Sequence, residues 1–97
     1  MNHLDHYIER ISKLKPELEQ RFGVNSIGLF GSVVRSDFSN QTSDIDIVVD
    51  FNRPVGIEFI ELGDYLENNL NRKVDLLSRN GIKPQYFKSI ESEIVYV

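Results

Sequence analysis

Two aspartates separated by one residue, Asp44 and Asp46, are the residues of this 97-residue chain whose spacing best suits chemistry. They lie in the segment SDIDIVV, where apolar and polar residues alternate as in a strand. Side chains alternate across a strand, so both carboxylates point to the same face, with their Cβ atoms about 7 Å apart. Such carboxylates repel each other, and a divalent cation such as Mg²⁺ relieves that repulsion. The alternative is that the pair lies on an ordinary solvated face.

A glycine-serine turn precedes the aspartates. Ser26 to Phe30 is a short apolar segment that predicts a strand, which ends at Gly31 and Ser32, where a short helix can begin at Val33. Backbone N–H groups at such a turn, together with the serine hydroxyl, form a site for a phosphate oxygen. The alternative is a plain turn with a helix cap. Neither motif is specific by itself, but their order and spacing along the chain are.

The elements that must position these residues follow from the spacing of apolar side chains. We expect a kink or a restart at Pro16 in the first helix, because proline removes an intrahelical hydrogen bond. The fold class is α/β (α+β), one small domain over residues 1–97 with a mixed sheet of three to four strands packed by helices on one side. The expected helices cover 1–20, 57–70 and the residues after Lys83-Pro84, and the expected strands cover 26–30, 44–49, 73–78 and 94–97.

Composition excludes several classes of protein. The net charge is −4 and there is no run of lysine or arginine, so direct binding of nucleic acid is not expected. There is no cysteine, which fits a reducing cytosol. The first residues are charged and no apolar run approaches about 20 residues, so neither a signal peptide nor a membrane span is expected. We therefore expect a cytoplasmic protein.

The segment GLFGSVVRSDFSNQTSDIDIVVDF resembles the signature of the minimal nucleotidyltransferases, which belong to the DNA polymerase beta-like superfamily. That signature is usually Gly-Ser, a few residues, Arg-Gly, a polar loop, and Ser-Asp-hydrophobic-Asp. The resemblance spans nearly the whole chain and includes RKVDLL, which is similar to the family's third-carboxylate strand and contains Asp75. The chain departs from the pattern at Ser36, where the family usually has glycine. If that position needs a positive φ, serine would strain or re-aim the loop.

The resemblance implies a site and a reaction. Two Mg²⁺ ions would be held by Asp44, Asp46 and Asp75, which would also be the catalytic residues. ATP would be the substrate, and AMP would pass to an acceptor hydroxyl. The residues expected to bind the nucleotide are Gly31, Ser32, Arg35 and Ser43. For Arg35 the alternative is a surface arginine that pairs with Asp37 beside the short helix.

The resemblance also implies a partner. Small domains of this family are similar to antitoxins that bind a HEPN-domain ribonuclease toxin and adenylylate it on tyrosine, so a hetero-oligomer with such a toxin is expected. The alternative is an antitoxin without catalysis that neutralises a basic ribonuclease by covering it, which the acidic balance suits. A nucleotidyltransferase acting on small molecules would need a second domain or a partner subunit.

Overall fold

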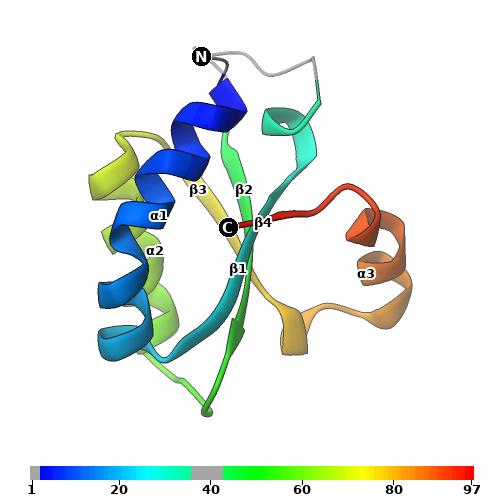
Figure 1. Ribbon diagram of the computed structural model, residues 1–97. Coiled ribbons are helices and arrows are strands. Elements are labelled where there is room, and N and C mark those ends of the chain that lie inside the picture. The colour runs from blue at the N-terminus through cyan, green and yellow to red at the C-terminus, as the bar shows by residue number, and fades with distance from the viewer. Residues whose placement is uncertain (1–2, 36–42) are drawn as a thin grey trace.

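The computed structural model describes residues 3–35 and 43–97. A 20-residue N-terminal helix leads into the first strand, and strands and helices then alternate to the C-terminus (Figure 1). The elements are α1 (His3–Phe22), β1 (Val24–Phe30), the 3₁₀ turn η1 (Gly31–Val33), β2 (Ile45–Phe51), α2 (Glu58–Leu70), β3 (Val74–Ser78), the 3₁₀ turn η2 (Arg79–Gly81), α3 (Pro84–Glu91) and β4 (Val95–Tyr96).

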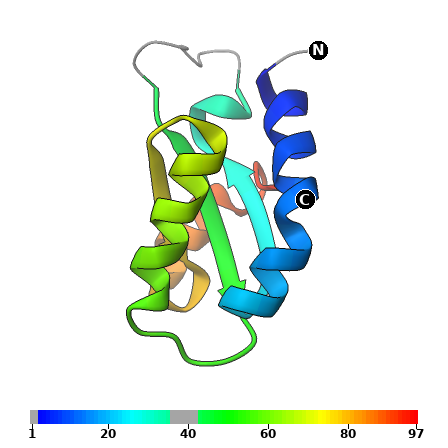
Figure 2. The same cartoon turned by 90° about the vertical axis from the view of Figure 1, so that its left-hand side faces the viewer.

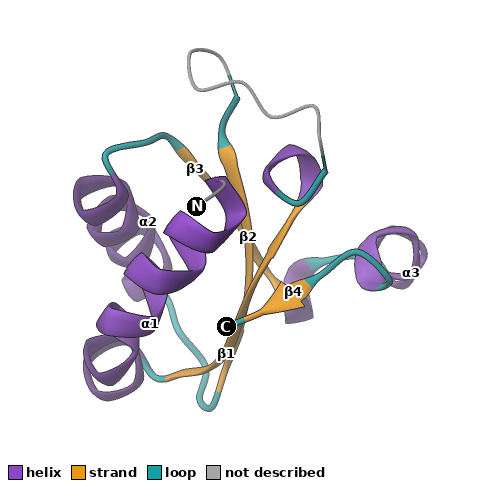
Figure 3. Ribbon diagram, turned by 45° about the horizontal axis from the view of Figure 1, so that its top comes forward, coloured by secondary structure: helices purple, strands orange, loops and turns teal. Residues whose placement is uncertain are grey.

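The strands form one mixed sheet in the order β3-β2-β1-β4 (Figure 3). β1 is antiparallel to both β2 and β4, whereas β2 and β3 run parallel because α2 carries the chain back between them. The register pairs Asp46 with Phe30 on one side and with Asp75 on the other. The predicted mixed sheet is confirmed, and its last strand lies at an edge as expected.

One face of the sheet carries the main core. Helices α1 and α2 lie side by side over this face (Figure 2). The inward residues of β2 are Ile45, Ile47 and Val49, which alternate with Asp46 and Val48 as the sequence predicts. Burial of apolar side chains here supplies the main stabilisation of the fold. The fully buried side chains that pack against the β2 residues come from β1, α1 and α2 and include Ile27, Leu29, Ile11, Leu18, Leu62 and Leu66.

The opposite face has a smaller cluster. Phe30, Val48 and Ile90 form it, with partly buried side chains from β3 and the C-terminal region around them. Ile90 belongs to α3, so α3 covers this second face (Figure 1). The expected layer of helices on one side therefore consists of α1 and α2. The sequence did not indicate that α3 would cover the other side of the sheet. The face that carries Asp46 is only partly covered, and Asp46 itself is half-buried.

Local backbone features end the helices of the main layer. α1 continues through Pro16 without a restart and ends at Gly23, whose φ of +70 lets its N–H bond to the Glu19 carbonyl at 3.2 Å. α2 ends at Asn71, which also has a left-handed φ, of 54°. Within residues 3–35 and 43–97, no helix combines the length and the apolar character needed to cross a bilayer.

Candidate active site

The three aspartates singled out from the sequence lie around the ends of β2 and β3. Asp46 is the second residue of β2 and is half-buried, and Asp75 is its direct neighbour in the parallel ladder. Parallel neighbours in register point to the same face, so these two carboxyl groups lie side by side. Asp44 is exposed and lies one residue before β2 begins. The sequence predicted the shared face of Asp44 and Asp46, and the register adds Asp75 to it.

The pKa of Asp46 is raised by burial and by the neighbouring charges. Burial, followed by the nearby carboxylates of Asp75 and Asp44, raises the pKa of this carboxyl from 3.8 to about 6. Arg35 acts in the opposite direction, and Glu93 adds to the increase. One arginine therefore does not neutralise the group of acids. Such a site attracts a cation, because a positive charge among the carboxylates would remove both their repulsion and the cost of ionising Asp46.

The segment before β3 holds the start of β2 in place. The Arg72 guanidinium donates a hydrogen bond to the Ser43 carbonyl oxygen at 2.5 Å. The Ile45 N–H donates to the Lys73 carbonyl oxygen at 2.9 Å. These two bonds lie on either side of Asp44 and fix its backbone relative to the strand that carries Asp75. Ser43, expected among the nucleotide-binding residues, thus contributes its carbonyl to the architecture of the site.

Gly31 permits the close approach of the turn to Asp46. Its φ is +73, a conformation that side chains rarely allow, and the residue is buried. A Cβ at this position would lie 2.0 Å from the Asp46 carboxylate oxygen Oδ2. Position 31 therefore requires glycine for two reasons: the backbone has a positive φ, and a side chain would clash with the Asp46 carboxylate. Ser32 follows in η1 and is half-buried, and the expected short helix is a single 3₁₀ turn that begins at Gly31 rather than at Val33.

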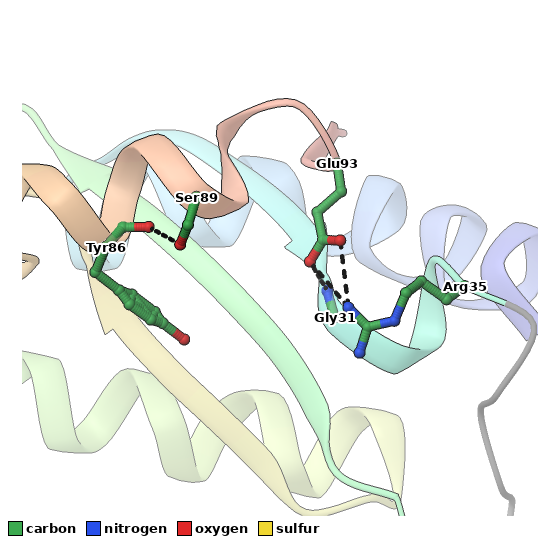
Figure 4. Close-up of polar contacts among 5 residues, drawn as sticks. All are labelled: Gly31, Arg35, Tyr86, Ser89 and Glu93. Carbon is green, nitrogen blue, oxygen red and sulfur yellow. Dashed lines mark hydrogen bonds and ion pairs between the residues drawn. The ribbon is translucent and has the colours of Figure 1, made fainter.

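A fourth carboxylate, Glu93, reaches the same turn from the segment between α3 and β4 (Figure 4). The Gly31 N–H donates to Glu93 Oε1 at 3.0 Å, and the Arg35 guanidinium lies 3.3 Å from Oε2. Arg35 therefore pairs with Glu93, while its alternative partner Asp37 lies outside the described residues, as does Ser36. No local pattern in the sequence points to Glu93, because 62 residues separate it from Gly31.

The arrangement suits a metal that is shared with a substrate. Among residues 3–35 and 43–97, no three chelating side chains converge closely enough to enclose an ion by themselves. Mg²⁺ is commonly held by one or two carboxylates and completed by phosphate oxygens and water, so an incomplete protein ligand set is what this chemistry requires. Beside these carboxylates, the Gly31 N–H and the Arg35 guanidinium are hydrogen-bond donors, and both contact Glu93.

The model of the nucleotidyltransferase domain family matches residues 11–97, a range that includes the turn and all three aspartates. The chain belongs to this family. The minimal nucleotidyltransferase is 46% identical over 84 residues to the protein adenylyltransferase MntA of Thermococcus cleftensis, a match that covers 86% of this chain and 84% of that one. A relative from Methanocaldococcus jannaschii, provisionally named for the same activity, is 40% identical over 99 residues, which covers both chains completely.

Solved structures share the fold of this minimal nucleotidyltransferase. A toxin-antitoxin complex with AMP-PNP aligns with a TM-score of 0.74 and 25% identity, covering 91% of this chain and 69% of that chain. A second complex, of a tri-AMPylated Shewanella oneidensis HEPN toxin with its MNT antitoxin, aligns with a TM-score of 0.61 and 21% identity, covering 97% and 67%. The expected family and fold are thereby confirmed.

Proposed function

We propose that this nucleotidyltransferase transfers AMP from ATP to a hydroxyl group of a protein partner, with Asp44, Asp46 and Asp75 as its catalytic carboxylates. The observation that carries the proposal is the position of Asp46, which lies against the Gly31 turn, in register with Asp75 and in the field of Asp44. These carboxylates and the Gly31 turn, whose N–H groups can donate to a phosphate, lie on one partly covered face of the sheet. The similarity to a protein adenylyltransferase supports the same reaction class.

The residues present fit a pair of Mg²⁺ ions. All three carboxylates supply hard oxygen ligands. Burial, followed by the carboxylates of Asp75 and Asp44, raises the pKa of Asp46, and Arg35 offsets only part of this increase. Asp44 and Asp46 would hold both ions, and Asp75 would complete the site nearer the acceptor. Bound there, the ions would stabilise the charge that develops on the attacking and leaving oxygens.

The reaction itself is an in-line displacement at the α-phosphorus. The acceptor oxygen forms a bond to this phosphorus while the bond to the oxygen that bridges to the β-phosphate breaks, and pyrophosphate leaves. Asp75 accepts the proton of the hydroxyl as general base. The Gly31 and Ser32 turn and the Arg35 guanidinium hold the β- and γ-phosphates, with the Ser43 region beside them. The residues of this chain therefore orient the triphosphate and accept one proton from the acceptor.

The proposed acceptor is a tyrosine of a HEPN-domain ribonuclease toxin, with this chain acting as the antitoxin. Support comes from the solved complex that shares this fold, in which a tri-AMPylated Shewanella oneidensis HEPN toxin is bound to an MNT antitoxin. The chain's net charge of −4 is also complementary to a basic, RNA-cleaving partner.

The test is transfer of label from α-³²P-ATP to a purified HEPN-domain partner in the presence of Mg²⁺. Wild type is compared with the Asp44→Ala, Asp46→Ala double variant and with Asp64→Ala, which removes an exposed aspartate of α2 outside the site. We expect label on the partner with wild type and Asp64→Ala, none with the double variant, and loss of label when EDTA is added. Equal labelling by the double variant would refute the assignment of the carboxylates.

The second candidate function is neutralisation by covering alone, which the acidic balance of the chain favours. A growth assay, rather than the labelling assay, distinguishes this function from AMP transfer. Cells that express the toxin are rescued by wild type under both hypotheses, but Asp46→Asn rescues them only if the covering alone suffices. We expect this variant to fail while it still binds the toxin.

A further inference from the structure

The residues of the proposed site lie on three neighbouring strands, so they follow one another across the sheet. The turn at the end of β1 carries Gly31, β2 carries Asp46, and β3 carries Asp75, and the sheet order places β2 between the other two strands. In an in-line displacement the attacking oxygen and the leaving oxygen lie on opposite sides of the phosphorus. If pyrophosphate leaves toward the turn after β1, the acceptor hydroxyl must arrive from the side of β3.

A groove of about 520 Å³ lies on that side, and Asp75 forms part of its wall. The groove follows β3 between α2 and α3, and most of its surface is apolar. The side chains that matter here are Phe59 from α2, Leu77 from β3, Ile82 from the turn after it, and Lys83 and Tyr86 at the start of α3. On the acceptor side, Asp75 therefore borders a mostly apolar groove that Lys83 also lines.

The strand beside the groove has an open edge. β3 is the outermost strand of the sheet that the described residues form. At one end of this edge the Val74 N–H bonds to the Glu67 carboxylate at 2.9 Å, which identifies the direction in which its backbone points. Backbone groups alternate in direction along a strand, so Leu76 and Ser78 point the same way as Val74. Both line the groove. An extended peptide can pair with such an edge.

Exposed apolar side chains occur in the groove itself and at the start of the helix that carries Phe59. Tyr86 is 45% exposed, and Ile57 and Ile60, which lie on either side of the groove residue Phe59 in sequence, are 71% and 65% exposed. Exposed aromatic and aliphatic side chains next to a groove are typical of a surface that binds a polypeptide.

From these observations we infer that the β3 groove binds the acceptor protein, as an extended segment that lies along β3 and presents its hydroxyl side chain to Asp75. This inference rests on the proposed transfer of AMP to a protein. The apolar side chains of the segment fill the groove between Phe59 and Tyr86, while its backbone pairs with the open edge. The competing occupant is the adenine ring of the nucleotide, which the groove's apolar wall would also accommodate.

The test separates binding of the acceptor from binding of the nucleotide. Tyr86→Ala truncates the groove, and Tyr96→Ala is its matched control, because Tyr96 is 53% exposed on β4 at the opposite edge of the sheet. Lys83→Glu is a second groove variant at an exposed position. The KM for a purified HEPN-domain acceptor is measured in the AMP-transfer assay, and the Kd for AMP-PNP with Mg²⁺ by calorimetry. Circular dichroism checks that each variant is folded.

We expect both groove variants to raise the KM for the acceptor at least about tenfold and to leave the Kd for AMP-PNP within about twofold, with neither value changed in Tyr96→Ala. An increase in the Kd for AMP-PNP with an unchanged KM for the acceptor would make the groove the adenine site and overturn the inference. No change in either value would also overturn it.

A second measurement keeps the inference testable if the wild type transfers no AMP. p-Benzoylphenylalanine replaces Tyr86 or Tyr96, and the complex with the HEPN-domain protein is irradiated. In that case, cross-links from position 86 alone would support the groove as the docking surface, although the proposed AMP transfer would be refuted. Cross-links from position 96 alone, from both positions or from neither would overturn the groove, whatever the transfer assay gives.

Discussion

Asp46 is the residue at which the charges of the site meet, and its ionisation opposes folding at neutral pH. Burial, followed by the carboxylates of Asp75 and Asp44, raises its pKa to about 6. A carboxyl whose pKa is higher in the folded than in the unfolded protein stabilises the fold while it is protonated, below about pH 4. That contribution is lost as the pH rises through about 6, so near neutral pH the metal-free protein carries an electrostatic cost at this position.

Replacing Asp46 by asparagine removes that cost. We expect Asp46→Asn to raise the free energy of unfolding at pH 7.5, without metal, by about 1 kcal/mol, because solvent around the partly exposed carboxyl screens most of the effect. At pH 4 the gain should disappear, since the wild-type carboxyl is then protonated. Urea denaturation at the two pH values measures this difference. A gain of equal size at both would mean that ionisation is not its cause.

Glu93 occupies donors that the proposed reaction assigns to the triphosphate. Its carboxylate accepts a hydrogen bond from the Gly31 N–H and pairs with Arg35. A bound phosphate would compete for both groups and would be repelled by the carboxylate. We expect Glu93→Gln to lower the Kd for Mg²⁺-AMP-PNP about threefold to tenfold, measured by calorimetry.

The matched control for this prediction is Glu91→Gln, which makes the same change at an exposed position of α3 two residues earlier. Its Kd should stay within about twofold of wild type, and the gain in Glu93→Gln should shrink at high salt, because charge repulsion is screened. A weaker affinity in Glu93→Gln would instead indicate that Glu93 aligns Arg35 for the nucleotide.

At the scale of the element, α1 contains an internal weakness at Pro16. The helix continues through this residue because buried side chains on both sides, Ile11 and Leu18, hold the two halves against the sheet. Proline still removes one intrahelical hydrogen bond, and position 16 is exposed, so no packing compensates for it there. Packing therefore outweighed the local breaking signal, which is why the expected restart is absent.

We expect Pro16→Ala to raise the free energy of unfolding by about 1–3 kcal/mol, since alanine restores the helical N–H and has the higher helix propensity. Equilibrium urea denaturation measures the change. Glu17→Ala, at the next exposed position of the same helix, is the control and should alter stability by less than about 0.5 kcal/mol. Unchanged stability in Pro16→Ala would mean that the surrounding helix has already absorbed the cost.

The strands that carry the site were predictable from sequence, because alternation of apolar and polar residues is a local signal. It gave the orientation of Asp46 in β2, whereas the register of β2 with β3 added Asp75 to the same face. Contacts that depend on the sheet order were not predictable. Glu93 reaches Gly31 only because β4 pairs with β1, which aligns Tyr96 with Gly28. The apolar spacing of α3 likewise indicated a buried face, but not which side of the sheet it would cover.

At the scale of the whole molecule, the proposed ligand would bind across three strands. The turn that follows β1 contacts Asp46 of β2, and Asp46 is in register with Asp75 of β3. The same three strands anchor the core under α1 and α2. A ligand bound at all three strand ends therefore binds the folded state and not the unfolded chain, which couples occupancy of the site to global stability.

We expect Mg²⁺-AMP-PNP at 100 times its Kd to stabilise the fold by about 2.7 kcal/mol, which for a domain of this size raises the Tm by about 10 °C or more. Differential scanning calorimetry measures the shift. AMP-PNP with EDTA should give a much smaller shift, because the repulsion between carboxylates and phosphates is then unrelieved. The Asp44→Ala, Asp46→Ala double variant should give none with Mg²⁺. Full stabilisation of that variant would place the nucleotide elsewhere on the molecule, since its binding would then not depend on the carboxylates at the strand ends.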